Sequence, residues 1–366
     1  MNSSPTFWTR HRVLKWMAIV GGSLSGFFAV FVVTSLLVAD RPEPIAKTVS
    51  DDPSLPYLDV NGVRLHLQTF GDPNDPVVVV LHGGPGDDHL MLLSLVPLSD
   101  EYFLVFYDQR GSGLSERVSN EDLTYEGMRS ELGAIIDHFS PDEPVRLVGH
   151  SWGAMLASGY MGQHSDRVLQ AVLAEPGFLT PDAGEAFLEV TGGMPDLSAE
   201  LLSALWWTFM ESRHIDGPDD DARIDYKMLR LATTDVEDHP LAGYFCGGKP
   251  DPDAVAHFRF GTRANLFGQS NMMGDDGSLK APFADGVDAF PNKVLFMTGA
   301  CNTYIGVEHQ KKFHLALFQE TELVVIEGAG HLMFGDQPER SMEVIRGYFE
   351  EIQPEPETGV DEAAIE

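Results

Sequence analysis

The stretch that decides the fold is VRLVGHSWGA, residues 145–154. It begins with a short apolar run typical of a strand buried on both faces and continues into a helical stretch that starts at Ser151. Between the two lies the pattern G-x-S-x-G, in which a glycine on each side of a serine leaves room for a strained turn that lifts the hydroxyl out of the sheet. The pattern alone occurs by chance in many chains, and an ordinary tight turn is the alternative. Because it stands between a strand and a helix here, it predicts Ser151 as a nucleophile.

The same alternation of strand and helix surrounds this stretch on both sides. Short β-branched and apolar runs alternate with longer runs whose apolar residues recur at helical spacing. Strands separated by helices form parallel sheets, so the pattern predicts an α/β fold with a mostly parallel sheet flanked by helices. We expect strands at 63–69, 77–81, 103–107, 145–148, 169–174, 294–297 and 323–326, and helices at 125–139, 151–164, 307–318 and 338–352.

Two core blocks carry this alternation, residues 57–175 and 293–352, and the interval 176–292 separates them. That interval is too long for a connection within a compact domain. We therefore expect an inserted helical lid with an apolar underside, including helices at 199–213 and 221–232. Its many aromatic residues are predicted to form the core of the lid, with the wall of a substrate site as the alternative.

An apolar segment near the N-terminus, residues 16–39, contains no charged residue. At 1.5 Å per residue it is long enough to cross about 30 Å of hydrocarbon, which predicts an N-terminal transmembrane helix that is retained as a signal anchor. A cleaved signal peptide is the main alternative, although residues 37–39 match a cleavage site poorly, and a buried soluble helix is another. Three basic residues precede the segment, so residues 1–15 are expected in the cytoplasm and the body outside, in the periplasm or at the cell surface.

The chain is strongly acidic, with 24 Lys and Arg against 56 Asp and Glu and a formal net charge of −32. Nucleic-acid binding depends on basic side chains that neutralise phosphates, so the composition argues against a nucleic-acid or other polyanionic partner. Such an excess of acids is typical of proteins that stay soluble in concentrated salt, and we interpret the chain as halophilic. Residues 40–56 are predicted to be a linker, and residues 353–366 a solvated acidic tail.

A nucleophilic serine needs a general base, and the chain offers 13 histidines. His331 is the predicted base because it follows the expected strand 323–326 through the flexible run Gly328-Ala329-Gly330, in the last structural block. His150, beside the serine, is expected to be a packed turn residue.

The negative charge that develops on an attacked carbonyl oxygen needs preorganised N–H donors. The expected strand 77–81 ends in HGGPG, residues 82–86, whose glycines leave backbone amides uncovered. We predict an oxyanion hole formed by the amides of Gly84 and Trp152, with Gly83 as the alternative to Gly84. A glycine turn without a ligand is the competing interpretation.

Four motifs occur in an order and at separations that resemble the α/β-hydrolases of the proline iminopeptidase family. They are HGGPG at 82–86, DQRGSGLS at 108–115, GHSWGA at 149–154 and GAGH at 328–331. The resemblance extends over residues 57–352, strongly in the two core blocks and faintly in the lid. It implies an α/β-hydrolase fold in which Ser151 is the nucleophile, His331 the base, and the amides of Gly84 and Trp152 the oxyanion hole. It also implies that Asp108-Gln109-Arg110 organises the floor of the site.

The chain departs from this family at the third member of the triad. Where the family has an aspartate, in a G-x-x-D pattern, this chain has Gly299-Ala300-Cys301-Asn302. An amide can orient an imidazole but cannot stabilise the imidazolium. Glu175 ends the expected strand 169–174 just before the lid, the position of the acid in some dehalogenases of this fold. We predict Glu175 as the third member, with Asn302 as the alternative.

The second departure is in the lid, where the family carries a segment whose carboxylates grip the free amino terminus of the substrate. Residues 206–211, Trp-Trp-Thr-Phe-Met-Glu, resemble this segment loosely. Glu211 is therefore a candidate substrate-binding residue, and an exposed helical glutamate is the alternative.

Cys246 and Cys301 are too few for a disulfide scaffold or a structural zinc site, and either one bridge or two free thiols are possible. One lies in the lid and the other at the catalytic edge of the sheet, in a compartment that permits disulfides. We predict that they pair and tether the lid to the core.

Together these features predict a membrane-anchored serine hydrolase that cleaves a small ester or amide, including the N-terminal residue of a short peptide, without a metal or organic cofactor. Ser151 excludes the epoxide hydrolases and dehalogenases of this fold, which need a carboxylate nucleophile. Asn302 motivates the alternative, a non-catalytic or weakly active lid-gated binding or sensory protein on a hydrolase scaffold.

Overall fold

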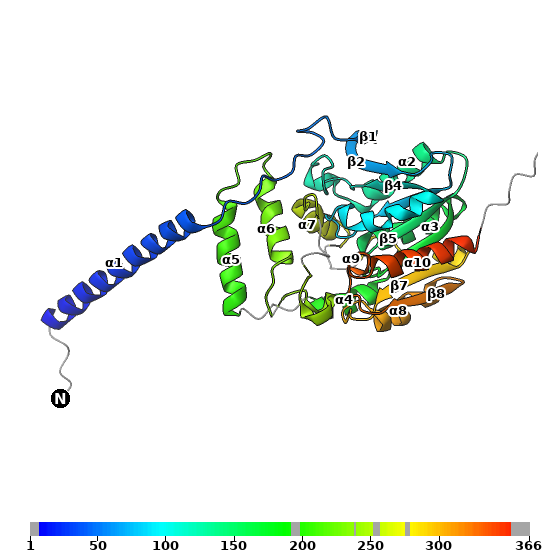
Figure 1. Cartoon of the computed structure of the whole chain (residues 1–366). Helices are drawn as coiled ribbons and strands as arrows, with labels where there is room; N and C mark the ends of the chain where they lie inside the picture. Colours follow the sequence, from blue (N-terminus) through cyan, green and yellow to red (C-terminus); the bar gives the residue numbers. More distant parts are fainter. Residues whose placement is uncertain (1–6, 192–197, 238, 252–256, 275–278, 353–366) are drawn as a thin grey trace, which may run out of the picture.

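A computed structural model describes residues 7–191, 198–237, 239–251, 257–274 and 279–352. Its centre is an eight-stranded sheet in the order β1-β2-β4-β3-β5-β6-β7-β8, layered between helices (Figure 1). β1 and β2 pair antiparallel, β2 is antiparallel to β4, and all other neighbours are parallel. The predicted fold class, a mostly parallel sheet flanked by helices, is confirmed. The strands are β1 Tyr57–Val60, β2 Val63–Phe70, β3 Val77–Leu81, β4 Phe103–Tyr107, β5 Val145–His150, β6 Val168–Ala174, β7 Val294–Gly299 and β8 Thr321–Ile326.

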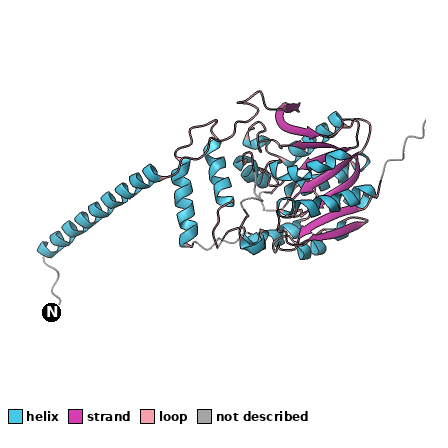
Figure 2. Ribbon diagram, viewed as in Figure 1, coloured by secondary structure: helices cyan, strands magenta, loops and turns pink. Residues whose placement is uncertain are grey.

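Helices cover both faces of this sheet (Figure 2). On one face α2 (Tyr125–Phe139) and α3 (Trp152–Gln163) pack on alternate strand residues such as Val79 and Leu147. On the other face the 3-10 helix η1 (Leu90–Asp100) and the helices α9 (Met333–Asp336) and α10 (Pro338–Glu350) pack on the residues between them, such as Val78 and Val80. α8 (Val307–Phe313) lies between β7 and β8 in the chain. The central strands are buried on both faces, which explains their continuous apolar runs.

The interval between β6 and β7, residues 176–292, is called here the inserted segment. Four helices lie in its described part: α4 (Pro181–Thr191), α5 (Ala199–Ser212), α6 (Ala222–Ala232) and α7 (Thr262–Asn271). α5 and α6 pack side by side beyond the carboxyl ends of the strands (Figure 1). Two short 3-10 turns follow them, η4 (Ala242–Tyr244) and η5 (Cys246–Gly248), and they lead the chain back to the core.

The first helix, α1 (Phe7–Val38), projects from the body near α5 (Figure 1). Its stretch Leu14–Val38 is the one helical run among the described residues that is long and apolar enough to cross a membrane. A helix of this kind at the N-terminus is either a membrane anchor or a signal sequence. The expected acidic tail, 353–366, lies outside the described residues, as do the first six residues of the expected cytoplasmic segment.

Candidate active site

Ser151 occupies the turn between β5 and α3 with backbone angles φ 53° and ψ −116°. A positive φ is rare for a residue with a side chain and marks a strained turn. The two flanking glycines are required by close packing: a Cβ on Gly149 would lie 2.5 Å from the carbonyl oxygen of Gly153, and one on Gly153 would lie closer still to that of Leu81. The sequence therefore folds here into the sharp turn that G-x-S-x-G indicates.

His331, which follows β8, meets Glu175 at the end of β6. The Nδ1–H of His331 donates to Oε2 of Glu175 over 2.6 Å. Glu175 is completely buried, and its other oxygen, Oε1, accepts from Thr298 Oγ1 at 2.7 Å and from the amide of Gly299 at 2.8 Å. A carboxylate held by this many donors is fixed in position and orients the imidazole so that Nε2 is left available.

Asn302 stands beside this pair without reaching the imidazole. Its Nδ2–H donates to the same Oε2 of Glu175 at 2.7 Å, and its Oδ1 accepts from the amides of Tyr304 and Ile305 at 2.9 and 3.1 Å. The structure thus brings both predicted candidates for the third member together: Glu175 accepts a hydrogen bond from His331, and Asn302 donates one to Glu175.

Two further aromatic residues hold His331. The imidazole stacks on the ring of Tyr244 with 4.4 Å between centroids, and the amide of His331 donates to the carbonyl oxygen of Tyr244 at 2.7 Å. On the other side lies His150, whose ring is 4.6 Å from that of His331. Burial lowers the pKa of His150 to about 3, so the ring is neutral and its Nε2–H donates to the carbonyl oxygen of His331 at 2.8 Å. Sequence reasoning missed Tyr244 because its segment carries no motif.

A disulfide between Cys246 and Cys301 joins the inserted segment to the loop after β7, which confirms the predicted pairing. Cys246 is two residues from Tyr244, and Cys301 directly precedes Asn302. The bridge is reinforced by the amide of Thr303, which donates to the carbonyl oxygen of Gly243 at 2.8 Å. The same few residues that hold His331 are therefore cross-linked to those that hold Glu175.

The glycine-rich loop after β3 lies against the serine. A Cβ on Gly83 would be 3.2 Å from the Cβ of Ser151, and Gly84 lines the same pocket as Ser151. Gln109 connects this loop to the turn: its Nε2 donates to the carbonyl oxygen of His82 at 3.1 Å, and its Oε1 accepts from Trp152 Nε1 at 2.7 Å. Gln109 thus fixes the relative position of the loop and of the residue after the serine.

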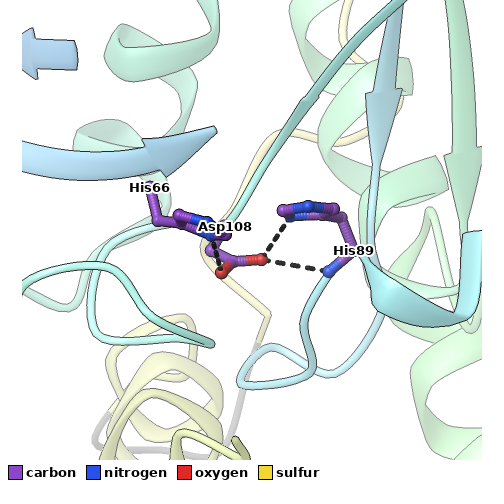
Figure 3. Close-up of side chains that lie close together, drawn as sticks. All are labelled: His66, His89 and Asp108. Atoms are coloured by element: carbon purple, nitrogen blue, oxygen red, sulfur yellow. Dashed lines mark hydrogen bonds and ion pairs between the residues drawn. The ribbon is translucent and has the colours of Figure 1, made fainter. Parts of the chain in front are cut away.

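Asp108, expected to organise the floor of the site, lies buried between the buried histidines His66 and His89 (Figure 3). The Nδ1–H groups of His66 and His89 donate to its two oxygens at 2.8 and 2.7 Å. The amides of His89 and Leu114 donate to the same carboxylate at 3.0 and 2.8 Å. Burial raises the pKa of Asp108, but these two histidines outweigh it and hold the pKa well below its usual range.

The three side chains of this floor are the residue types that bind metal ions, and they lie close enough together for one ion. The histidine nitrogen that faces the carboxylate carries a proton in each case and donates it to a carboxylate oxygen. Each of these oxygens also accepts a hydrogen bond from a backbone N–H. In this arrangement the three side chains satisfy one another by hydrogen bonds and hold together the segments that carry them.

A pocket of about 380 Å³ opens above these residues, and Ser151 and His331 both line it. The hydrogen bonds of these described residues do not include one between Ser151 Oγ and His331 Nε2. In free enzymes such a contact is often long and tightens when substrate binds. Most of the lining is apolar and comes from the core and the inserted segment, including Met155, Phe178, Phe187, Met228, Phe260 and Met272.

Among the described residues that line this pocket, Asp87 is the one with a carboxylate, and its Oδ1 lies 3.6 Å from Nε2 of His257. Burial alone would raise the pKa of Asp87 and lower that of His257, but their pairing outweighs it. The pKa of Asp87 is consequently lowered and that of His257 raised, so each group favours the charged form of the other.

Glu211 lies away from the Ser151 pocket. Its Oε2 accepts from the hydroxyl of Tyr226 at 2.6 Å and lies 3.6 Å from Nε of Arg230. It lines a separate groove between α5, α6 and the end of α1. The structure therefore does not bring this predicted substrate-binding residue to the serine.

Comparison with known proteins identifies the family. Residues 76–338 match the model of the alpha/beta hydrolase fold family. The chain is 34% identical over 127 residues to a proline iminopeptidase of Heyndrickxia coagulans, which covers 34% of this chain and 44% of the relative. It is 33% identical over 118 residues to epoxide hydrolase A of Mycobacterium tuberculosis, covering 32% of this chain and 36% of the relative. These matches span less than half the length of each of these relatives.

Solved structures show the same architecture. VinJ superimposes with a TM-score of 0.56 at 21% identity, over 85% of this chain and 100% of that one. The proline iminopeptidase of Mycobacterium smegmatis superimposes with a TM-score of 0.55 at 18% identity, over 81% of this chain and 98% of that one. On the strength of the family match, the chain belongs to the alpha/beta hydrolase fold family, and over about a third of its length it is similar to proline iminopeptidases.

Proposed function

We propose that this protein is a serine hydrolase that works through an acyl-enzyme on Ser151. The Oγ of Ser151 attacks the carbonyl carbon of the substrate while its proton passes to Nε2 of His331, and the imidazolium gives that proton to the leaving group. Water then attacks the acyl-enzyme by the same route and releases the acid. The observation that carries the proposal is the 2.6 Å bond from His331 Nδ1 to the buried Glu175, in a pocket that Ser151 also lines.

In this proposal Glu175 supplies the negative charge that stabilises the imidazolium. Asn302 supports Glu175 rather than replacing it, because its amide donates to the carboxylate. Asn302 motivates the alternative of a non-catalytic scaffold, and the hydrogen bond from His331 to the carboxylate of Glu175 supports the catalytic proposal over it.

The oxyanion hole is assigned to the backbone amides of Gly84 and Trp152. Support comes from Gly84 in the pocket lining and from Gln109, which ties the glycine loop to Trp152. Donors held in place before the reaction stabilise the oxyanion without reorganising.

The substrate class that fits best is a carboxylic ester with an apolar acyl group. An aminopeptidase needs a carboxylate to hold the substrate's ammonium group. Among the described residues that line the pocket, the single carboxylate is that of Asp87, and it is paired with His257. The remaining lining is mostly apolar, with methionine, leucine and phenylalanine its most frequent residues, and such a surface binds hydrocarbon.

A substrate panel tests this assignment. We expect kcat/KM for nitrophenyl esters to rise with acyl length up to a medium chain, by about fourfold per buried methylene, which corresponds to ~0.8 kcal/mol. Aminoacyl naphthylamides should react at least about tenfold more slowly, since they place a charged amine in an apolar pocket. A preference for prolyl naphthylamide would restore the peptidase assignment and contradict the ester.

We further propose that α1 is retained as a membrane anchor and that the body lies outside the cytoplasm. The proposal is supported by the length of the uncharged stretch and by the three basic residues that precede it. Protease treatment of spheroplasts, in which any outer barrier has been opened and the inner membrane is intact, should then cleave the body, and a body protected until the inner membrane is lysed would contradict this topology.

A further inference from the structure

We propose that one face of α5, formed by Leu202, Leu205, Trp206 and Phe209, is a membrane-docking surface that lies in the lipid interface beside α1. The proposal rests on α1 spanning a membrane and is independent of the hydrolytic function. It concerns the inserted segment, whose helices α5 and α6 stand between α1 and the rest of the body (Figure 1).

Exposed apolar side chains gather on the inserted segment. Outside α1, the large hydrophobic residues exposed in the described part of the chain are Tyr57 and eight residues of three inserted helices. A very acidic body thus has its apolar surface concentrated in one segment. Contiguous exposed apolar surface marks an interaction site. The eight residues are Leu188 and Val190 on α4, Leu202, Leu205, Trp207 and Phe209 on α5, and Leu266 and Phe267 on α7.

α5 has two different long faces. Leu202, Leu205 and Phe209 are 50%, 38% and 49% exposed and recur at the spacing of one helical face, on which Trp206 also lies. The other face turns towards α6 and the groove and carries the polar residues Glu200 and Glu211 together with Trp207. This division is that of a helix that lies at a membrane surface.

α1 contacts this apolar face directly. The ring of Phe31 stacks on that of Trp206 with 5.2 Å between centroids. Just beyond the end of α5, a ring nitrogen of His214 donates to the carbonyl oxygen of Leu36 at 3.1 Å. The membrane-spanning helix therefore leaves the body along the apolar face of α5, and whatever surrounds α1 also meets that face.

The depth of this contact matches the lipid interface. Phe31 precedes Val38, the last residue of α1, by about seven residues, or about 10 Å at 1.5 Å per residue. In this proposal Trp206 lies at the depth of the boundary between headgroups and acyl chains. Tryptophan is favoured at that depth, and amphipathic helices bury their apolar faces there. The groove beside the end of α1 is lined by charged residues such as Asp40 and Arg230, as expected at the water side of that boundary.

A bilayer fits this surface better than a protein partner does. A second copy or a soluble protein would have to cover the face of α5 while α1, packed against it, stays in lipid. The proposed surface is one helix away from the Ser151 pocket, because α6 packs on α5 and contributes Met228 and Leu229 to the pocket lining.

Quenching of tryptophan fluorescence by brominated lipids tests the proposal without measuring hydrolysis. The background is the full chain with Trp8→Phe and Trp16→Phe. It carries either Phe209→Trp or the matched control Phe267→Trp. Each protein is reconstituted in vesicles of phosphatidylcholine that is brominated in the upper part of the acyl chain. Both replaced residues are exposed aromatics of the inserted segment, and Phe267 lies on α7, which does not adjoin α1 in Figure 1. We expect roughly half of the emission added by Phe209→Trp to be quenched, and little of that added by Phe267→Trp.

Equal quenching of the two added indoles, or no quenching of the one added by Phe209→Trp, would overturn the proposal. Leu205→Trp serves as a second probe of the same face should Phe209→Trp disturb the helix. A variant that keeps Trp16 reports whether α1 is inserted in the bilayer. If brominated lipid does not quench Trp16, α1 does not enter the membrane and the proposal fails. Adding Ser151→Ala should leave every result unchanged, which separates this test from that of the hydrolase.

Discussion

Two residues of the site, Ser151 and Glu175, hold positive φ angles of 53° and 47°. They end the neighbouring strands β5 and β6, and each turn aims its side chain at the same edge of the sheet. Such angles cost of order 1–3 kcal/mol for a residue with a side chain and persist only where the surroundings enforce them. The chain accepts this cost at the two positions that the proposed mechanism uses for nucleophile and acid.

The pair Glu175 and Asn302 gives the sharpest prediction at the scale of single residues. Glu175→Gln should lower kcat on a nitrophenyl ester by about 10³- to 10⁴-fold, since an amide does not stabilise the imidazolium. Asn302→Ala should lower it by only about tenfold, because Glu175 keeps its bonds to Thr298 and Gly299.

Steady-state kinetics of the two variants, with circular dichroism to check folding, measure this difference. Thr298→Val is the matched control, since it also removes one hydrogen bond to Glu175 without touching the charge. Near-full activity of Glu175→Gln together with loss of activity in Asn302→Ala would reverse the two roles.

How much of the site the sequence predicts depends on whether a residue carries a local signal. Ser151 and His331 are indicated by glycine-rich motifs after strands, and Glu175 by its place at the end of a buried strand. Tyr244 has no such signal, because its contact with His331 arises only when the inserted segment folds back over the core. Likewise, Asn302 is visible as a departure from the family pattern, but its bond to Glu175 depends on the tertiary structure.

At the scale of elements, the strands of the buried sheet are predicted to within one or two residues because their apolar runs are continuous. Two of the elements that were not predicted, η1 and α7, lack such periodicity. η1 is apolar on all sides and contains Pro97, and α7 is polar without a stripe. The short strand β1 does have a signal, the dipeptide Asn61-Gly62 with positive φ at both residues, which favours a hairpin to β2.

The disulfide is the element that ties the inserted segment to the core, and its removal should affect both stability and activity. The double variant Cys246→Ser/Cys301→Ser should lose about 3–4 kcal/mol of unfolding free energy, the value for closing a loop of some tens of residues. It should also lower kcat, since the bridge holds the segment that stacks on His331. Denaturant titration and ester kinetics, with and without reductant, measure the two effects. A reductant that changes neither would contradict this role.

The ion pair between Asp87 and His257 is a second link between the core and the inserted segment, and it predicts a pH dependence. The pKa of His257 is raised, so its contribution to stability is complete below the pKa of about 6.5 in the unfolded chain and is lost as the pH rises through the folded value. The pKa of Asp87 is lowered, so its contribution is complete above about 3.9 and is lost as the pH falls further. The melting temperature of His257→Gln should therefore differ from that of the wild type most near pH 5–6 and less at pH 9. A difference that grows with pH would exclude the ion pair as its cause.

At the scale of the whole molecule, a net charge of −32 sets the conditions in which the fold is stable. Self-repulsion among so many carboxylates is strong at low ionic strength and is screened when the Debye length falls from about 10 Å at 0.1 M to about 3 Å at 1 M salt. The melting temperature should consequently rise when sodium chloride is added across this range. Sucrose, which does not screen charge, is the control, and a melting temperature that falls with salt would contradict the halophilic interpretation.

The site residues lie far apart along the chain, and their positions in the sequence do not indicate how they are arranged in the site. Ser151, Glu175 and His331 come from both core blocks, and they meet because parallel strands end at one edge of the sheet. The sequence indicates which strands exist, whereas their order in the sheet follows from packing that no local pattern records.

The central claim is that Ser151 is an activated nucleophile in the native fold. Labelling the folded full-length chain with a fluorophosphonate and mapping the modified peptide by mass spectrometry tests it directly, because only an activated serine reacts rapidly with this reagent. We expect a single covalent adduct on Ser151, absent in Ser151→Ala and strongly slowed in His331→Ala. A folded chain that takes up no label, or takes it up on another serine, would contradict the account.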